Sequence, residues 1–229
     1  MIIDGRNKFL GVDVDSLSDK IMDIIDCDQG SDEWFEARMG IPSASNFSRI
    51  CTTAGKWSAQ ADAYINELAA EVITGQRSSN GFTSDAMQRG IDLEPQARSN
   101  FEFMHDFEVY QVGFCINNSI GAGCSPDGLI GTDAGLEIKC PMGHNHLAYL
   151  RGGVLPTKYI QQVQGSLLVT ERDVWHFYSY HPDFGEQLMV TVNRDEKFIG
   201  LLKSHLERAT DHISEYIAKF KKGEKNVTQ

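Results

Sequence analysis

Hydrophobic and polar residues alternate with helical spacing in the first half of the chain. Apolar residues recur every three to four positions over residues 57–74, and a glycine follows as a helix stop. Two further helices are predicted over residues 31–40 and 84–103, each headed by a serine that can cap its N-terminus. Pro95 is predicted to kink or divide the last of these, because proline has no backbone N–H to donate.

The pattern changes after the third helix. Alternating aromatic and β-branched residues over 107–117 predict a strand, and two shorter strands over 126–130 and 136–141 are separated by glycines, as in a meander. The other predicted elements are a helix over 158–169, strands over 174–180 and 187–193, and a long amphipathic helix over 195–222.

This order of elements indicates an α/β or α+β fold with a sheet flanked by helices. A chain of 229 residues can bury one sizeable core, so its length does not require a second domain. We therefore expect a single domain over residues 1–229, in which an acidic segment of about residues 1–28 precedes the core.

The charge balance restricts the possible partners. Lys and Arg number 21 and Asp and Glu number 32, for a net charge of −11. An acidic surface repels phosphates, which argues against a protein that coats DNA non-specifically. The first forty residues hold ten acids and four bases, so −6 of the net charge of −11 lies there, largely ahead of the core. A local DNA site in the core is therefore still compatible with the composition.

No segment resembles a membrane span or a secretory signal, since none approaches the roughly 18 to 20 apolar residues that a span requires. The 5 cysteines are odd in number and form no CxxC pair, which fits neither a disulfide framework nor a zinc ribbon. We expect a cytoplasmic protein without membrane contact, whose cysteines are small core residues.

Two neighbouring segments carry candidate chemistry: Ser125-Pro-Asp127-Gly and Glu137-Ile-Lys139. Side chains alternate along a strand, so Glu137 and Lys139 share one face, and a hairpin can bring Asp127 beside them. Carboxylate oxygens suit Mg²⁺ or Mn²⁺, and an ammonium group can position a water or offset charge at a phosphate.

A bare Glu-x-Lys tripeptide is most often an exposed ion pair on a strand. The upstream Ser-Pro-Asp-Gly segment changes this interpretation, and so does Glu94, which lies on a predicted helix and can supply a third acid. Together they favour a metal-dependent site.

The chain resembles the phage lambda-type exonucleases, viral recombinases with the PD-(D/E)xK core of restriction-endonuclease-like folds. The resemblance covers about residues 28–197 and implies a central mixed β-sheet flanked by helices. It rests on six ordered motifs: Trp34…Ala-Arg38-Met-Gly-Ile-Pro-Ser-Ala-Ser45, Gly90…Glu94, Cys124-Ser-Pro-Asp127-Gly, Leu136-Glu-Ile-Lys-Cys-Pro141, Tyr159…Gln161-Gln-Val-Gln164 and Arg194-Asp-Glu-Lys197.

The resemblance implies roles for the candidate residues. Asp127 and Glu137 match carboxylates that ligate two divalent metals, and the backbone carbonyl of Ile138 matches a further ligand. Lys139 matches the catalytic lysine beside the attacking water, and Glu94 matches the helix-borne acid that completes the site. The implied cofactor is two Mg²⁺ per active site, with Mn²⁺ as a substitute.

A second set of residues matches the family's contacts to the DNA end. Arg38, Ser45 and Ser125 match residues that bind the 5′-phosphate, and a guanidinium can hold a terminal phosphate bidentately. Gln164, or as a weaker choice Gln161, matches the glutamine of the helix behind the active site.

The activity implied is a Mg²⁺-dependent 5′-to-3′ exonuclease that resects duplex DNA ends carrying a 5′-phosphate and leaves 3′ overhangs for a single-strand annealing protein. A ring-shaped homotrimer and a phage or prophage origin in a bacterial cytoplasm are implied with it. The alternatives are a restriction-like or structure-specific endonuclease on the same core, and a non-catalytic DNA-end-binding scaffold. The scaffold is disfavoured because all the acids and the lysine are retained.

Other polar residues are given structural roles. Gly143-His-Asn-His146 is interpreted as a polar loop rather than a His-Asn-His nuclease motif, and His176 as a packed histidine. Arg77, on a predicted loop over residues 76–83, and the basic segment 219–222 are candidate phosphate contacts, although solvated charge is the commoner explanation.

Overall fold

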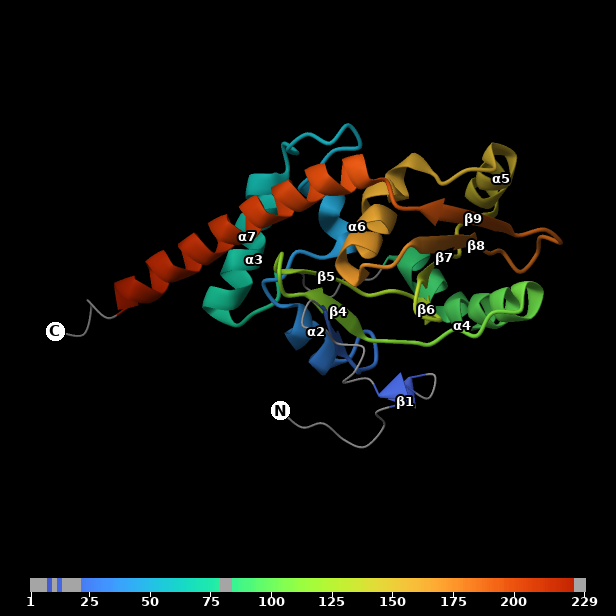
Figure 1. Cartoon of the computed structure of the whole chain (residues 1–229), viewed down its shortest axis with the longest axis horizontal. Helices are drawn as coiled ribbons and strands as arrows, with labels where there is room; N and C mark the ends of the chain where they lie inside the picture. Colours follow the sequence, from blue (N-terminus) through green and yellow to red (C-terminus); the bar gives the residue numbers. More distant parts are fainter. Residues whose placement is uncertain (1–7, 10–11, 14–21, 79–83, 225–229) are drawn as a thin grey trace.

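The computed structural model describes residues 8–9, 12–13, 22–78 and 84–224. A four-stranded mixed sheet carries the chemistry-bearing segments (Figure 1). Its order is β6 (Gly128–Ile130), β7 (Ala134–Lys139), β8 (Val174–Ser179) and β9 (Leu188–Asn193). Strand β7 pairs antiparallel with β6 and parallel with β8, and β9 is antiparallel to β8. The predicted mixed sheet is confirmed.

A second, antiparallel sheet lies beside the first. It consists of β3 (Met22–Ile25), β4 (Phe114–Asn117) and β5 (Ala122–Cys124). A separate two-residue pair joins β1 (Lys8–Phe9) to β2 (Val12–Asp13). The helical elements are α2 (Asp32–Arg38), η1 (Ala44–Arg49), α3 (Ala61–Thr74), α4 (Asp85–His105), α5 (Gly143–Gly152), η2 (Thr157–Tyr159), α6 (Ile160–Thr170) and α7 (Glu196–Glu224).

Predicted helix ends agree with the caps in the structure. The Ser31 hydroxyl accepts the Trp34 N–H at 3.1 Å, and the Ser84 hydroxyl accepts the Met87 N–H at 3.3 Å. Gly75 ends α3 in the left-handed conformation, with φ of 66°. Local signals alone therefore fix where these three helices begin or end.

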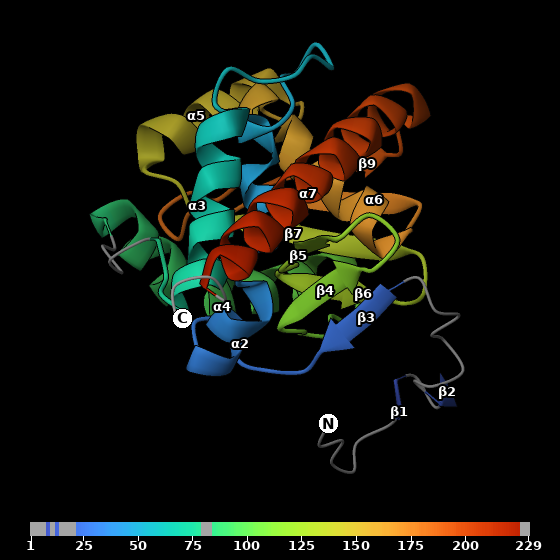
Figure 2. The same ribbon diagram turned by 90° about the vertical axis from the view of Figure 1, so that its left-hand side faces the viewer.

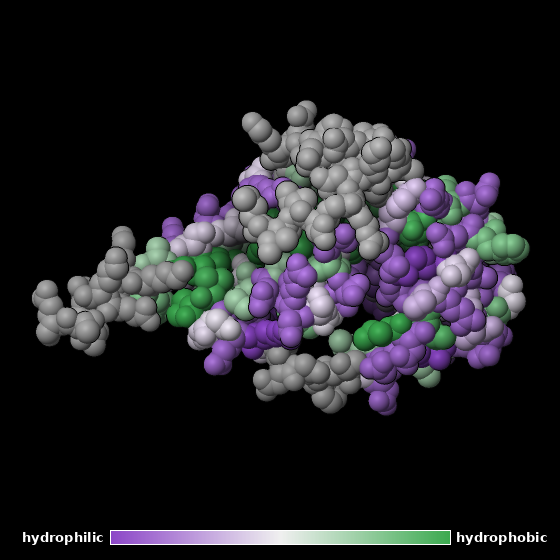
Figure 3. All heavy atoms as spheres, turned by 90° about the horizontal axis from the view of Figure 1, so that it is seen from below, coloured by the Kyte–Doolittle hydropathy of each residue, from purple (hydrophilic) through white to green (hydrophobic). Residues whose placement is uncertain are grey.

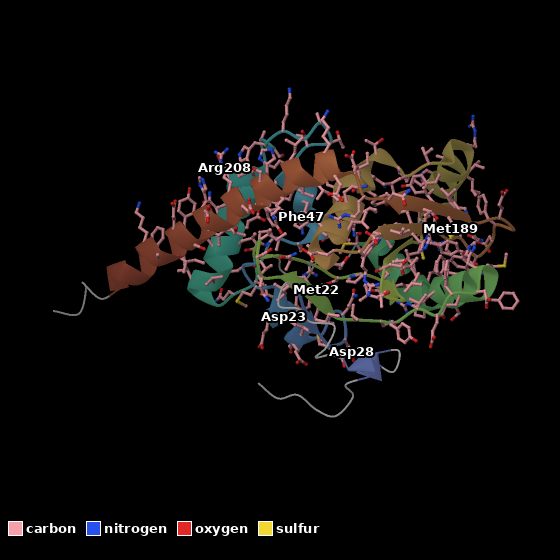
Figure 4. All side chains as sticks on the ribbon, viewed as in Figure 1. Met22, Asp23, Asp28, Phe47, Met189 and Arg208 are labelled. Atoms are coloured by element: carbon pink, nitrogen blue, oxygen red, sulfur yellow. The ribbon has the colours of Figure 1, made fainter. Side chains whose placement is uncertain are left out.

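Helix α6 forms the centre of the molecule, with contacts to β4, β5, β8, η1 and α7. Nearly all of its residues are buried. Phe47 lies beside it in the interior (Figure 4), and a Cβ on Gly165 would come within 2.3 Å of the Phe47 ring. Only glycine at position 165 allows η1 and α6 to pack this closely.

Helix α4 covers the other face of the mixed sheet. Its residues Ala97 and Phe101 are fully buried in a cluster that includes Leu136, Ile138 and Tyr178. Helices α3 and α7 pack side by side, and the C-terminal part of α7 projects from the body (Figures 1 and 2). Seen from below, hydrophilic side chains cover much of the visible surface, and apolar side chains form separate groups toward the left and the lower right (Figure 3).

Several local predictions were wrong. The strand expected over 107–117 is restricted to β4, because the preceding residues pack elsewhere: Phe107 stacks on Phe101, and Tyr110 exchanges backbone hydrogen bonds with Leu129. Of the kink or division predicted at Pro95, the division does not occur: α4 continues through Pro95, which is an exposed residue. The three residues of β5 form a strand that the pattern did not predict.

The polar segment Gly143–His146 is the first turn of α5 and not a loop. His146 is fully buried, and its ring nitrogens contact the Ser179 hydroxyl at 2.8 Å and the Glu186 carbonyl at 3.1 Å. His176 is packed as predicted, between Phe107 and Thr191. The loop residues 79–83 and most of the acidic segment lie outside the described residues, and the single-domain boundary remains a prediction.

Candidate active site

Strand β7 separates its side chains as the period-two pattern requires. Leu136 and Ile138 point into the cluster under α4, while Glu137 and Lys139 share the opposite face. Glu137 is 1% exposed, and its Oε1 forms an ion pair with the Lys139 ammonium. A buried carboxylate is therefore neutralised by its neighbour two residues along the strand.

Asp127 stands immediately before β6 and ties the hairpin together. Its backbone N–H donates to the Leu136 carbonyl at 3.1 Å, and its carboxylate accepts the Ile138 N–H at 2.5 Å. The hairpin thus brings Asp127 beside Glu137 and Lys139, as the sequence predicted.

Glu94 joins this group from α4. It pairs with Arg98 one turn along the helix, and the Arg98 Nε donates to the Asp127 carbonyl at 3.1 Å. The charge of Glu94 acts on both Asp127 and Glu137. Arg98 therefore joins the helix to the hairpin and holds the third acid near the other two.

The acids of this cluster oppose one another's ionisation. Burial, together with the Asp127 charge, raises the pKa of Glu94 and of Glu137 to about 7. Burial also raises the pKa of Asp127. For Lys139, burial alone would lower the pKa, but the charges of Glu137 and Asp127 raise it overall. The cluster therefore has more negative charge than its lysine can offset.

This excess suits divalent cations, because the available donors are hard carboxylate oxygens and the Ile138 carbonyl. As the side chains lie, however, Glu94 is bound to Arg98 and Glu137 to Lys139. Within the described part of the chain, no three acidic, histidine or cysteine side chains are grouped so as to hold a metal ion by themselves. The donor chemistry fits a cation, which would compete with these internal ion pairs.

A pocket of about 460 Å³ opens onto the cluster. It is bounded by α4, the end of β7 and η2, and its wall includes Glu94, Asp127 and Lys139. Apolar side chains of Met87, Ile91 and Met142 line its rim and are more than half exposed. Glu94 and Asp127 therefore face a space that a substrate can enter.

The glutamine that reaches the cluster is Gln162. Its Nε2 donates to the Glu137 carboxylate at 2.6 Å. Gln164 instead donates to the Asn193 carbonyl at 2.9 Å and accepts the Asp195 N–H at 2.9 Å, and Gln161 donates to the Cys51 carbonyl. Gln162 could not be selected from the sequence because positions 161, 162 and 164 are all glutamine. Only the orientation of the helix about its axis decides which of them faces β7.

Replacing these two glutamines separates the two roles. Gln162→Ala removes a charge-assisted donor from Glu137, so we expect about a tenfold loss of nuclease rate with an unchanged urea midpoint. Gln164→Ala removes two half-buried hydrogen bonds, to the Asn193 carbonyl and from the Asp195 N–H, and should lower the unfolding free energy by about 1–3 kcal/mol. The opposite assignment of the two effects would show that Gln164 is the residue that acts at the site.

Arg38 and Ser125 lie outside the lining of this pocket and are joined by Trp34. The Arg38 guanidinium stacks 3.9 Å from the Trp34 ring centre and donates to the Ser43 hydroxyl at 3.1 Å. The Trp34 indole N–H donates to the Ser125 hydroxyl at 2.8 Å, and burial lowers the Arg38 pKa. Ser45 is exposed at the start of η1. Trp34 thus links Arg38 and its partner Ser43 to Ser125, which lies two residues before Asp127 in the sequence.

Other candidate cations are placed differently. Arg77 forms an ion pair with Asp32 at 2.7 Å and stacks 3.7 Å from the Phe35 ring centre. Lys219 is exposed near the projecting end of α7. Neither residue lines the pocket beside Asp127.

Comparison with known proteins decides the family. The model of the YqaJ-like viral recombinase domain matches residues 33–173, more than half of the chain. The chain belongs to the YqaJ-like viral recombinase family. This confirms the predicted relationship to the lambda-type exonucleases and implies a nuclease. No curated protein matches the chain.

Solved structures agree with this YqaJ-like assignment. The alkaline exonuclease LHK-Exo of Laribacter hongkongensis is 28% identical, with a TM-score of 0.76 over 86% of this chain and 100% of that chain. Its complex with dAMP matches equally well. A phage-related exonuclease from Haemophilus somnus 129PT is 16% identical, with a TM-score of 0.60 over 79% of this chain and 96% of that chain, and shows likeness of fold alone. The restriction-endonuclease-like fold is therefore confirmed.

None of the described helices of this YqaJ-like protein has the length and apolar character needed to cross a membrane.

Proposed function

We propose that the protein is a Mg²⁺-dependent 5′-to-3′ exonuclease that resects double-stranded DNA ends and leaves 3′ overhangs for single-strand annealing. The observation that carries the proposal is that Glu94, Asp127 and Lys139 line one pocket, with the buried Glu137 paired to Lys139 behind them. Family membership supports DNA as the substrate, and the alkaline exonuclease LHK-Exo supports end-dependent hydrolysis.

The residues of the chain divide the work of phosphodiester hydrolysis. Asp127, Glu137, Glu94 and the Ile138 carbonyl would hold two Mg²⁺, with Mn²⁺ as a substitute. Bound metal supplies a water of lowered pKa and stabilises charge on the attacking and leaving oxygens. Lys139, held at the pocket by Glu137, would position the water and offset the charge at the phosphate. Gln162 fixes the Glu137 carboxylate from the side of α6.

The residues around Trp34 would hold the end of the substrate. Arg38 can bind a 5′-phosphate bidentately, and the Ser45 and Ser125 hydroxyls would complete the pocket. Because Ser125 lies two residues before Asp127, a terminal phosphate bound there stays close to the hydrolytic cluster. This arrangement favours attack at the end of a strand over attack within a duplex.

The same proposal includes the oligomeric state of the enzyme, its protein partner and its cellular location. A ring of three copies would keep the enzyme on its duplex, and a single-strand annealing protein would take up the overhang in the cytoplasm of a bacterial host. Sedimentation of the purified protein tests the ring, and a monomer at working concentration would count against it.

The activity is tested by Mg²⁺-dependent digestion of linear duplex DNA labelled at the 5′ or the 3′ end. We expect early release of the 5′ label as mononucleotide, late release of the 3′ label, and no cleavage of covalently closed circles. Cleavage of circles would support the endonuclease alternative. Binding of ends without hydrolysis in Mg²⁺ or Mn²⁺ would support the non-catalytic scaffold.

Metal binding should also appear as pH-dependent stability. The raised pKa values of Glu94 and Glu137 mean that the folded chain keeps protons that the unfolded chain has lost. Their contribution to stability is present below about pH 4.5 and is lost as the pH rises through about 7. Mg²⁺ binds the ionised acids, so it should raise the melting temperature more at about pH 8 than at about pH 5.

Thermal melts with Mg²⁺ or EDTA at both pH values measure this effect. Asp127→Asn, which removes one metal-binding carboxylate, is the matched variant and should lose most of the Mg²⁺-induced rise. An equal rise at both pH values, retained in Asp127→Asn, would show that Mg²⁺ acts elsewhere on this acidic protein.

A further inference from the structure

Arg89 is a half-buried arginine for which the described structure gives no hydrogen-bond acceptor. Its Nε and Nη2 atoms are buried and have no partner among the described residues. Other inward-facing arginines are satisfied: Arg98 by Glu94 and the Asp127 carbonyl, and Arg172 by three backbone carbonyls. A guanidinium cannot lose its proton to relieve such a cost, so its donors need an acceptor from outside the described chain.

The position of Arg89 directs it to the pocket beside the active site. It lies on α4, just over one turn before Glu94, and lines the same 460 Å³ pocket as Asp127 and Lys139. Its charge also acts on the Cys140 thiol, the neighbour of Lys139, and lowers the pKa of that thiol against the larger effect of burial. The guanidinium therefore lies near the end of β7, in the pocket onto which the acidic cluster opens.

The acids nearest to Arg89 along α4 do not neutralise it. Asp92 lies three residues along the helix and lines a neighbouring recess, but its carboxylate accepts from the Gln88 amide at 2.8 Å. Asp85, one turn earlier, is exposed and lines the same recess. Over the described ranges, no ion pair links Arg89 to either acid.

The chemistry of the pocket indicates an anionic ligand with several oxygens. Lys158 lines the wall formed by η2, with its ammonium 4.8 Å from the Tyr159 ring centre. Arg89 on α4 and Lys158 on η2 thus bring two cations to one space in a protein of net charge −11. A planar guanidinium with free donors matches two oxygens of a phosphate.

We propose that Arg89 forms a second phosphate subsite, which binds an internal phosphodiester of the DNA strand being degraded. This inference rests on the proposed function. The ligand is an internal phosphate and not the 5′-terminal one, because Arg38 and Ser125, which would hold the terminal phosphate, do not line the pocket that Arg89 shares with Asp127. With one contact at Arg38 and another at Arg89, the strand would be held at two points near the reacting bond.

The test compares Arg89→Gln with wild type on short 5′-phosphorylated duplexes in which one linkage at a time is a neutral methylphosphonate. Binding is measured in Ca²⁺ and turnover in Mg²⁺. At one internal linkage near the 5′ end, the methylphosphonate should weaken wild-type binding by about 10- to 100-fold. The same substitution should add little to the defect of Arg89→Gln, since both remove one contact.

Three controls accompany this comparison. Arg208→Gln removes a guanidinium that stacks on Trp57, on the far side of the molecule from α4 (Figure 4), and should bind every duplex as wild type does. Arg89→Lys should recover part of the affinity. The melting temperature of Arg89→Gln should not fall, because the guanidinium has no hydrogen bond within the described fold to lose.

The proposed subsite would be contradicted if the methylphosphonate and Arg89→Gln weakened DNA binding additively at every internal linkage. It would also be contradicted if Arg89→Gln bound the duplexes with wild-type affinity. Should Arg89→Gln fail to fold, the wild-type scan still decides, since tight binding to all internally substituted duplexes contradicts the proposal. Failure of the proposed function is a separate outcome: wild type would then bind the duplexes in Ca²⁺ without cutting them in Mg²⁺.

Discussion

Lys139→Ala should lower the rate of linear duplex digestion by a factor on the order of 10³ or more. The lysine is the only cation that the described structure pairs with Glu137, and its charge also acts on Asp127 and Glu94. Alanine removes the group that would position the water and offset charge at the phosphate. Single-turnover digestion of saturating duplex measures this loss without a contribution from DNA binding.

The matched control for this variant is Lys203→Ala. Lys203 is an exposed lysine on α7, 4.0 Å from Glu207, and its loss should leave the rate unchanged. Asp127→Asn and Glu137→Gln should be as inactive as Lys139→Ala. Digestion by folded Lys139→Ala at the wild-type rate would show that the active site lies elsewhere.

Arg38→Ala should abolish the preference for 5′-phosphorylated ends over 5′-hydroxyl ends. The guanidinium is oriented by Trp34 and Ser43, so its charge-assisted bonds to a phosphate need little reorganisation. Loss of such bonds should reduce the ratio of the two digestion rates by about 10- to 100-fold, mainly through slower cutting of phosphorylated DNA.

Initial rates on two duplexes that differ only at the 5′ end measure that ratio. Arg49→Ala is the matched control, because Arg49 is also half-buried but is bound to Glu67 by two short hydrogen bonds, at 2.6 and 2.7 Å. It should change stability and leave the ratio intact. If Arg38→Ala kept the wild-type ratio of digestion rates on the two duplexes, Arg38 would not be part of the 5′-phosphate site.

Helix boundaries were predictable from sequence where one residue carries the signal. Ser31 and Ser84 cap their helices through their own hydroxyls, and Gly75 supplies the left-handed residue that ends α3. Helix α5 lacks a side-chain cap and has glycines at both ends, so nothing local distinguished it from a loop. Its existence depends on the packing of His146 against Ser179 and the Glu186 carbonyl.

The same division applies to the candidate site. Strand periodicity alone places Glu137 and Lys139 on one face, and the hairpin brings Asp127 to them, so the sequence was sufficient to predict this cluster. Gln162 and Arg89 were not, because a polar residue on a helix shows neither its rotation nor its partners. Gln162 is important because it donates a hydrogen bond to the Glu137 carboxylate, and Arg89 because its buried nitrogens have no acceptor in the described structure.

The sequence by itself determined the α/β class, the residue types of the acidic cluster and the caps that start its helices, since these depend on neighbours within a few residues. Tertiary structure decided which side chains meet. The hydrogen bond from Arg98 to Asp127 spans 29 positions and that from Gln162 to Glu137 spans 25, and packing around Gly165 sets the position of α6. Such contacts depend on the relative placement of whole elements, which no local pattern contains.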